Sequence, residues 1–293
     1  MVTAATKREV AVVQLPHPGG EWGPDPTTQT RGWTDWNHGH ARKFLRHTGR
    51  YEDQRRNAVA GPLTFWGEWE GPSSLEATHS LEPGAPAWFQ VPRRGDPAVV
   101  PRPQNTDPFV FGAFVYSNCQ QDHEWPKGSG RYRRFATSML AEGSVILFGS
   151  TRRGEFVLDT CLVVGDIIEI DSLHFEQQAA GRVPEAFITT TLKPIFIGVQ
   201  ERRLSLYLGA QHDAPFSSMY SFFPSHPASN RPVAFSRPAL ELEGLLGTFV
   251  NPKSSRRFTK HDCTLETARG VWTEVRCQVE RAGCHVGVFA DPL

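Results

Sequence analysis

Apolar residues in this chain gather in short runs separated by turn-forming residues. The clearest runs are 143–150 and 155–164, joined by the turn at 151–154. Two apolar runs around a glycine-containing turn predict a β-hairpin. Residues 9–15 predict another strand, which ends at the proline- and glycine-rich stretch 16–20.

Further short strands are predicted where apolar or β-branched residues recur between polar ones. They lie at 63–70, 167–171, 187–192, 195–200, 204–208 and 271–279. Residues 38–50 predict a helix instead, because Ala41, Phe44 and Leu45 can share one face while the arginines point outward.

Two proline-rich stretches, 82–108 and 210–238, predict long loops. Together these predicted elements indicate a β-rich α+β protein with a mixed or antiparallel sheet or a small PUA-like barrel, long loops and few helices. A length of 293 residues suits one compact domain. It can be subdivided into an aromatic and polar part, 1–125, and a barrel-like part, 126–293.

Composition bears on the partners and the cellular compartment that we expect for the protein. Lys plus Arg equals Asp plus Glu at 31 each, so net charge gives no argument for nucleic acid or membrane. Basic residues do cluster locally, and such clusters either contact phosphates or form an ordinary solvated face. The five cysteines include no CxxC pair, and no apolar leader opens the chain. Reduced thiols in a cytoplasm are therefore expected.

All but one of the eight tryptophans lie in the first 125 residues. Trp66 and Trp69 alternate with polar groups in the segment 65–70, and each buried polar group needs a hydrogen-bond partner. Flat rings beside directional hydrogen-bonding groups are typical of a pocket for a planar heterocycle such as a nucleobase. We expect both rings to bind a base.

Glu68 and Glu70 point to the same face if this segment is a strand. Carboxylates near indole rings can act as a general acid or base, because desolvation raises their proton affinity. They can equally accept hydrogen bonds from the N–H edge of a base, or form the charged outer face of an edge strand. The sequence leaves these three interpretations open.

His38 and His40 could offer two imidazoles to a metal, but nothing nearby completes a ligand set with familiar spacing. We predict no metal and no cofactor. His38 is better suited to hydrogen bonding or proton transfer.

Cys119 has an unusual setting for a thiol that merely packs, since Asn118 and Gln120 flank it. A nucleophilic Cys119, activated by a histidine such as His38 and oriented by Glu68 or Asp107, is one hypothesis. In the other, Asn118 and Gln120 read the edge of a base.

Five segments, taken as an ordered set, resemble bacterial proteins associated with modified nucleobases in DNA. They are 14–21, 39–45, 65–70, 105–112 and 118–121. Within that group they are similar to the Dpd-type component that converts 7-cyano-7-deazaguanine in DNA to its amide. The hairpin at 143–164 also resembles strands of a PUA-like barrel, a fold-level analogy that does not establish function.

The resemblance implies addition of water to a nitrile. Cys119 would attack the nitrile carbon, or a base would activate water directly, with Glu68 managing protons. Stacking on Trp66 or Trp69 would hold the deazapurine. The phosphate ligands would be Arg42, Lys43, Arg152 and Arg153.

The expected function is therefore that of an enzyme on a modified base in DNA, with DNA and other proteins of a modification or defence system as partners. Two alternatives stay open. One is a non-catalytic, PUA-like reader of a modified base. The other is an enzyme that acts on a free nucleoside or nitrile.

Overall fold

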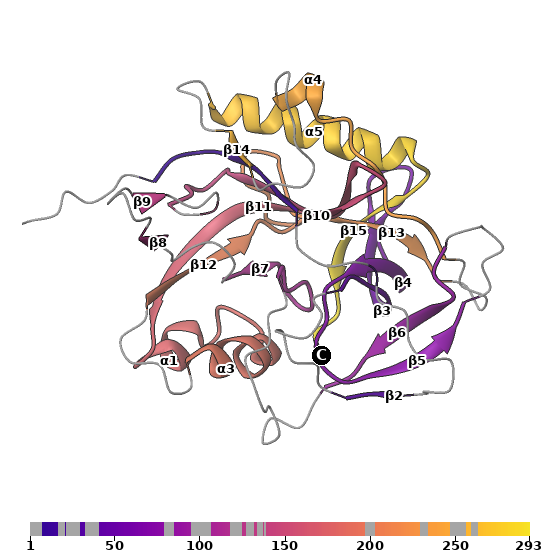
Figure 1. The fold of residues 1–293 in the computed structure, drawn as a ribbon, viewed down its shortest axis with the longest axis horizontal. Helices are drawn as coiled ribbons and strands as arrows, with labels where there is room; N and C mark the ends of the chain where they lie inside the picture. Colours follow the sequence, from indigo (N-terminus) through magenta and orange to yellow (C-terminus); the bar gives the residue numbers. More distant parts are fainter. Residues whose placement is uncertain are drawn as a thin grey trace, which may run out of the picture.

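Two large β-sheets, a long helix and a short helical segment make up most of the described part of the computed structural model (Figure 1). The structure describes residues 8–16, 21, 30–32, 41–78, 85–94, 107–117, 125–126, 132–133, 137, 139–196, 203–228, 234–246, 256–258 and 263–293. The prediction of a β-rich α+β protein with mixed sheets and few helices is confirmed.

The first sheet has six strands in the order β14-β1-β10-β11-β12-β7. They are β1 (Val12–Pro16), β7 (Val115–Tyr116), β10 (Val145–Arg152), β11 (Glu155–Asp171), β12 (Arg203–Gly209) and β14 (Arg256–Phe258). β1 runs parallel to β10, and the other neighbours are antiparallel. The predicted hairpin is β10 and β11, and Gly154 adopts the left-handed φ of 90° that its tight turn requires.

The second sheet has seven strands in the order β15-β13-β4-β3-β6-β5-β2. They are β2 (Thr30–Arg31), β3 (Lys43–Glu52), β4 (Ala58–Gly67), β5 (Ser73–Ala77), β6 (Trp88–Pro92), β13 (Phe223–Pro227) and β15 (His285–Ala290). Because β15 pairs with both β13 and β3, four strands close into a small ring. Gly49 permits this closure, since a Cβ there would lie 2.2 Å from the carbonyl oxygen of Phe289.

The long helix α5 (Leu265–Arg281) begins at Thr264, whose side chain accepts a hydrogen bond from the backbone N–H of Thr267. The remaining regular elements are short: β8 (Trp125–Pro126), β9 (Tyr132–Arg133), α1 (Phe175–Ala179), α2 (Glu185–Phe187), a π-helical turn (Ile188–Leu192), α3 (Lys193–Phe196) and α4 (Glu243–Leu246). In the described part of the chain, no helix has both the length and the apolar character needed to cross a membrane.

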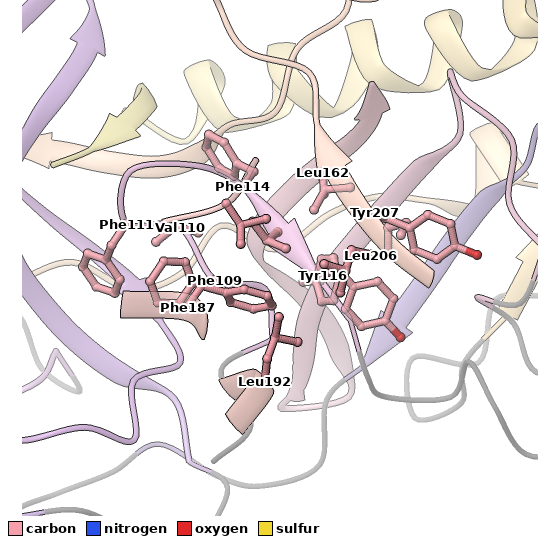
Figure 2. Close-up of a cluster of buried hydrophobic side chains, with 14 of the residues drawn as sticks. Phe109, Val110, Phe111, Phe114, Tyr116, Leu162, Phe187, Leu192, Leu206 and Tyr207 are labelled. Carbon is pink, nitrogen blue, oxygen red and sulfur yellow. The ribbon is translucent and has the colours of Figure 1, made fainter. Parts of the chain in front are cut away.

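The first sheet is buried on both faces. Along β10, Val145 and Leu147 face a core that includes residues of α5, whereas Ile146 and Phe148 face the core shared with Phe187 of the opposite helical segment. Figure 2 shows the aromatic side of the second of these cores. Burial on both faces explains why the strand sequence is a continuous apolar run rather than an alternating one.

Four predicted elements are wrong in whole or in part, and the stretches 82–108 and 210–238, predicted as loops, contain the strands β6 and β13. The helix expected over 38–50 is the strand β3 from Lys43 onward, and the strand expected over 187–192 is helical. The strand expected over 271–279 lies within α5, where Val271, Val275 and Val279 share the buried face. Residues four positions apart lie on the same face of a strand and also on the same face of a helix. The apolar pattern of 271–279 therefore does not distinguish a strand from a helix. The strand expected at 195–200 begins as α3, and 197–200 lie outside the described residues.

Three half-buried histidines predict that acid destabilises the fold. Burial lowers the pKa of His47, His226 and His285 below the ordinary value of 6.5. The unfolded chain then binds protons at a pH where the folded chain does not, so the free energy of unfolding should fall as pH drops through that value. Urea unfolding at about pH 7.5 and about pH 5.5 measures this. His226→Gln should reduce the pH dependence, and an unchanged pH dependence would contradict the prediction.

Candidate functional site

Charged side chains of alternating sign lead from the surface into the contact between the two sheets. We call these six residues the charge ladder. In order from the surface they are Arg152, Glu21, Arg237, Asp159, Arg42 and Glu68.

The outer half of the ladder is partly open to solvent. Arg152 Nη1 lies 2.6 Å from Glu21 Oε1, and Arg237 Nη2 lies 3.1 Å from the same oxygen. The side chains of Arg152 and Glu21 are 26% and 27% exposed, whereas that of Arg237 is only 2% exposed. The buried part of the ladder therefore starts at Arg237.

Inside, Asp159 is shared by two guanidinium groups. Its Oδ1 lies 3.0 Å from Arg237 Nη1, and its Oδ2 lies 2.6 Å from Arg42 Nε. Arg42 Nη1 donates in turn to Glu68 Oε2 at 3.1 Å. Asp159, Arg42 and Glu68 are all at most 3% exposed. Each inner charge thus has an opposite charge as its neighbour.

Strand register explains the meeting of Arg42 and Glu68. Lys43 of β3 pairs with Gly67 of the antiparallel β4, so Arg42 and Glu68 extend the two strands by one residue each at the same end of that pair and face each other. Asp159 comes from β11 of the other sheet. The ladder therefore joins both sheets.

Glu68 also receives a backbone N–H. The amide of Asp107, a fully buried residue, donates to Glu68 Oε2 at 3.3 Å. Phe109 and Val115 exchange two backbone hydrogen bonds of 2.8 Å, and Asp107 and Ser117 flank that pair two residues away on either arm.

Four expected site residues lie outside the described residues. They are His38, Asn118, Cys119 and Gln120.

Two of the expected phosphate ligands are placed elsewhere than predicted. Arg42 and Lys43 are buried, and the Lys43 ammonium bonds to Glu70 with both side chains fully enclosed. A buried cation neutralised by a carboxylate does not reach a DNA phosphate at the surface. The same contact means that Glu70 is not open to the edge of a base. Arg152 is half-buried and Arg153 is exposed at the hairpin turn.

The two tryptophans are core residues rather than walls of an open base pocket. Trp66 and Trp69 are 2% and 1% exposed. Their indole N–H groups donate to the carbonyl oxygens of Phe235, at 2.8 Å, and Pro72, at 3.1 Å. Trp66 also lies against Arg237, whose guanidinium carbon is 5.1 Å from its ring centroid. Packing against protein covers the surface that a stacked base would need.

Two described cysteines, Cys161 and Cys284, are buried and differ from the setting proposed for Cys119. Burial raises the pKa of the Cys284 thiol to about 12, and it raises that of Cys161 well above its usual range. Such thiols are poor nucleophiles. Among the described residues, no group of three or more His, Cys, Asp or Glu side chains is arranged to hold a metal ion.

Asp159 and Arg237 are members of the site that sequence reasoning missed. Asp159 had a detectable signal, because an acid in the middle of the apolar strand 155–164 must be paired if that strand is buried. Arg237 lies in a loop with no comparable pattern. Within the described part of the chain, Arg42 Nη2 and Arg237 Nε have no hydrogen-bond acceptor.

Comparison of the chain with protein-family models, with curated proteins and with solved structures finds no match. The grounds for a functional assignment are therefore the ladder and the ordered sequence segments around it. Buried, mutually paired titratable groups cost stability and often mark functional sites.

Proposed function

We propose that this chain is an enzyme that modifies a 7-deazaguanine-type base in DNA by hydrating its nitrile to an amide. The observation that supports this most is the fixed carboxylate of Glu68, which both Arg42 and the Asp107 amide hold. In the sequence, His38 precedes Arg42 by four positions and Cys119 follows Ser117 by two. The resemblance of the ordered segments supplies the substrate class.

Glu68 is suited to accept a proton at the start of the reaction. An adjacent guanidinium favours the ionised form of a carboxylate. In the overall reaction the oxygen of water bonds to the nitrile carbon, and both protons of that water end on the nitrogen of the amide. Glu68 would take a proton from the attacking group and return it to the nitrile nitrogen.

Cys119 would divide this reaction into two steps. Its thiolate forms a C–S bond to the nitrile carbon while the nitrogen gains a proton, which gives a thioimidate. Water then adds to that carbon, the C–S bond breaks, and the amide leaves with the thiol restored. The net change is the addition of one water, with no oxidant or reductant.

Mass spectrometry of nucleosides from DNA tests the proposal. DNA containing 7-cyano-7-deazaguanine, incubated with the protein, should yield a nucleoside heavier by the mass of one water. Glu68→Gln and Cys119→Ala should each lower the rate by at least about a hundredfold. Product formation that both variants leave intact would overturn the catalytic assignment.

Matched variants separate chemistry from stability. Glu52→Gln removes the carboxylate charge from another buried ion pair, with Arg276, at the far end of the ten-residue strand β3, about 30 Å from Arg42. It should cost stability and leave turnover unchanged. Cys277→Ala is the control for the thiol, since Cys277 is a half-buried residue of α5.

The same assays identify the two alternatives. Tight binding of the modified duplex without any mass change would indicate a reader. Turnover of the free nucleoside, without salt-dependent binding of DNA, would indicate a small-molecule enzyme.

A further inference from the structure

The outer half of the ladder has the geometry of an anion site. Arg152 and Arg237 converge on a single oxygen, Glu21 Oε1, at 2.6 and 3.1 Å. Two guanidinium groups around one anionic oxygen are typical of phosphate recognition, because their N–H donors are planar, charged and directional. A carboxylate of the chain itself occupies that position here.

Arg237 is held in place before any ligand arrives. Its Nη1 donates to Asp159 Oδ1 at 3.0 Å and also to Ser150 Oγ, and its guanidinium lies over the ring of Trp66. With its side chain only 2% exposed, Arg237 has little freedom left to lose on binding. Its Nη2 is therefore a fixed donor directed at the position of the Glu21 carboxylate.

Arg152 and Glu21 make this position reachable from solvent. Both side chains are about a quarter exposed, and exposed Arg153 follows Arg152 at the hairpin turn. Rotation of the Glu21 side chain would free Arg152 Nη1 and Arg237 Nη2 without disturbing the contact between Arg237 and Asp159. The two freed guanidinium N–H groups would then need another anion as their acceptor.

We propose that Arg152 and Arg237 form a phosphate-binding site for which the Glu21 carboxylate is an internal competitor. A phosphate of the DNA backbone displaces Glu21 and takes its place between the two arginines. The DNA source of the phosphate rests on the proposed function, whereas the site itself rests on the contacts described above. The site would anchor DNA at the surface end of the ladder whose inner end is Glu68.

Titration calorimetry with inorganic phosphate, in chloride buffer, tests the site without reference to base chemistry. Glu21→Ala should bind phosphate about tenfold more tightly than the unaltered protein, the effect of about one charge-assisted hydrogen bond freed from competition. Glu21→Gln, which keeps the side-chain volume, should also bind more tightly. Adding Arg152→Gln to Glu21→Ala should abolish the gain.

A matched carboxylate provides the control. Glu169 is exposed on the same sheet, in β11, and pairs with Arg8. Glu169→Ala should leave phosphate affinity unchanged. Equal phosphate affinity in the unaltered protein and both Glu21 variants, each shown to be folded by its thermal transition, would overturn the site.

Duplex DNA distinguishes the source of the phosphate. Affinity of Glu21→Ala for an unmodified duplex should exceed that of the unaltered protein, with a logarithmic salt slope steeper by about 0.9 for one added phosphate contact. A gain with inorganic phosphate but none with the duplex would overturn the DNA assignment. Phosphate binding of this kind without nucleoside conversion would contradict the proposed function alone, and conversion without it would contradict this site alone.

Discussion

Replacing Asp159 with alanine should lower the free energy of unfolding by about 3–5 kcal/mol, the cost typical of breaking a buried ion pair. The carboxylate is 1% exposed and lies between Arg42 and Arg237, which are themselves almost fully enclosed. Its removal leaves two buried guanidinium groups with one less anion between them. Water cannot replace the lost contact without opening the junction of the two sheets.

Urea unfolding followed by circular dichroism measures this effect. Glu169→Ala is the matched control, since Glu169 lies on the same strand and pairs with Arg8 at the surface, where its side chain is 62% exposed. It should cost less than about 1 kcal/mol. Equal losses in the two variants would show that the ladder is not the desolvated network described here.

The apolar runs predicted the parts of the fold whose strands are buried on both faces. β10 and β11 were predictable because their sequence is continuously apolar around a tight turn. β3 was not, because Phe44 and Leu45 are adjacent apolar residues that fit a helical face as well as a strand buried on both sides. Which one forms depends on β4, β6 and β15, the strands that pair with β3. No local pattern carries that information.

The candidate site could be predicted in its residue types but not in its pairings. Glu68 and Asp107 were expected as alternative residues that orient Cys119, and the structure joins them through the backbone N–H of Asp107, which donates to Glu68. Arg42 was expected to point outward and to bind phosphate, as one of a local cluster of basic residues. Its burial follows from the register of β3 on β4 and from Asp159 in the other sheet, a contact between residues 117 positions apart (159 minus 42). Sequence spacing alone does not reveal such contacts.

Trp69→Ala should be as damaging as the loss of Asp159, with a cost of about 3–5 kcal/mol for a deleted core aromatic. The Trp69 ring is 1% exposed and meets Phe111 edge to face, with centroids 5.3 Å apart. Phe111 in turn contacts Phe65 and Phe109, so a cavity at Trp69 would open beside a cluster of rings. Gly71 cannot fill it, because it has no side chain and already lies against the indole.

The measurement separates a core tryptophan from a base-binding one. Trp88→Ala is the control, since Trp88 on β6 is only partly buried and should cost about 1 kcal/mol. Trp69→Phe should recover part of the loss, because a smaller ring still fills much of the space. A stacking role would give the opposite result, with stability kept and affinity for the modified base lost. That outcome would show that the indole is accessible to ligand and that Trp69 belongs to the base-binding site. A large loss of stability would instead show that other residues bind the base.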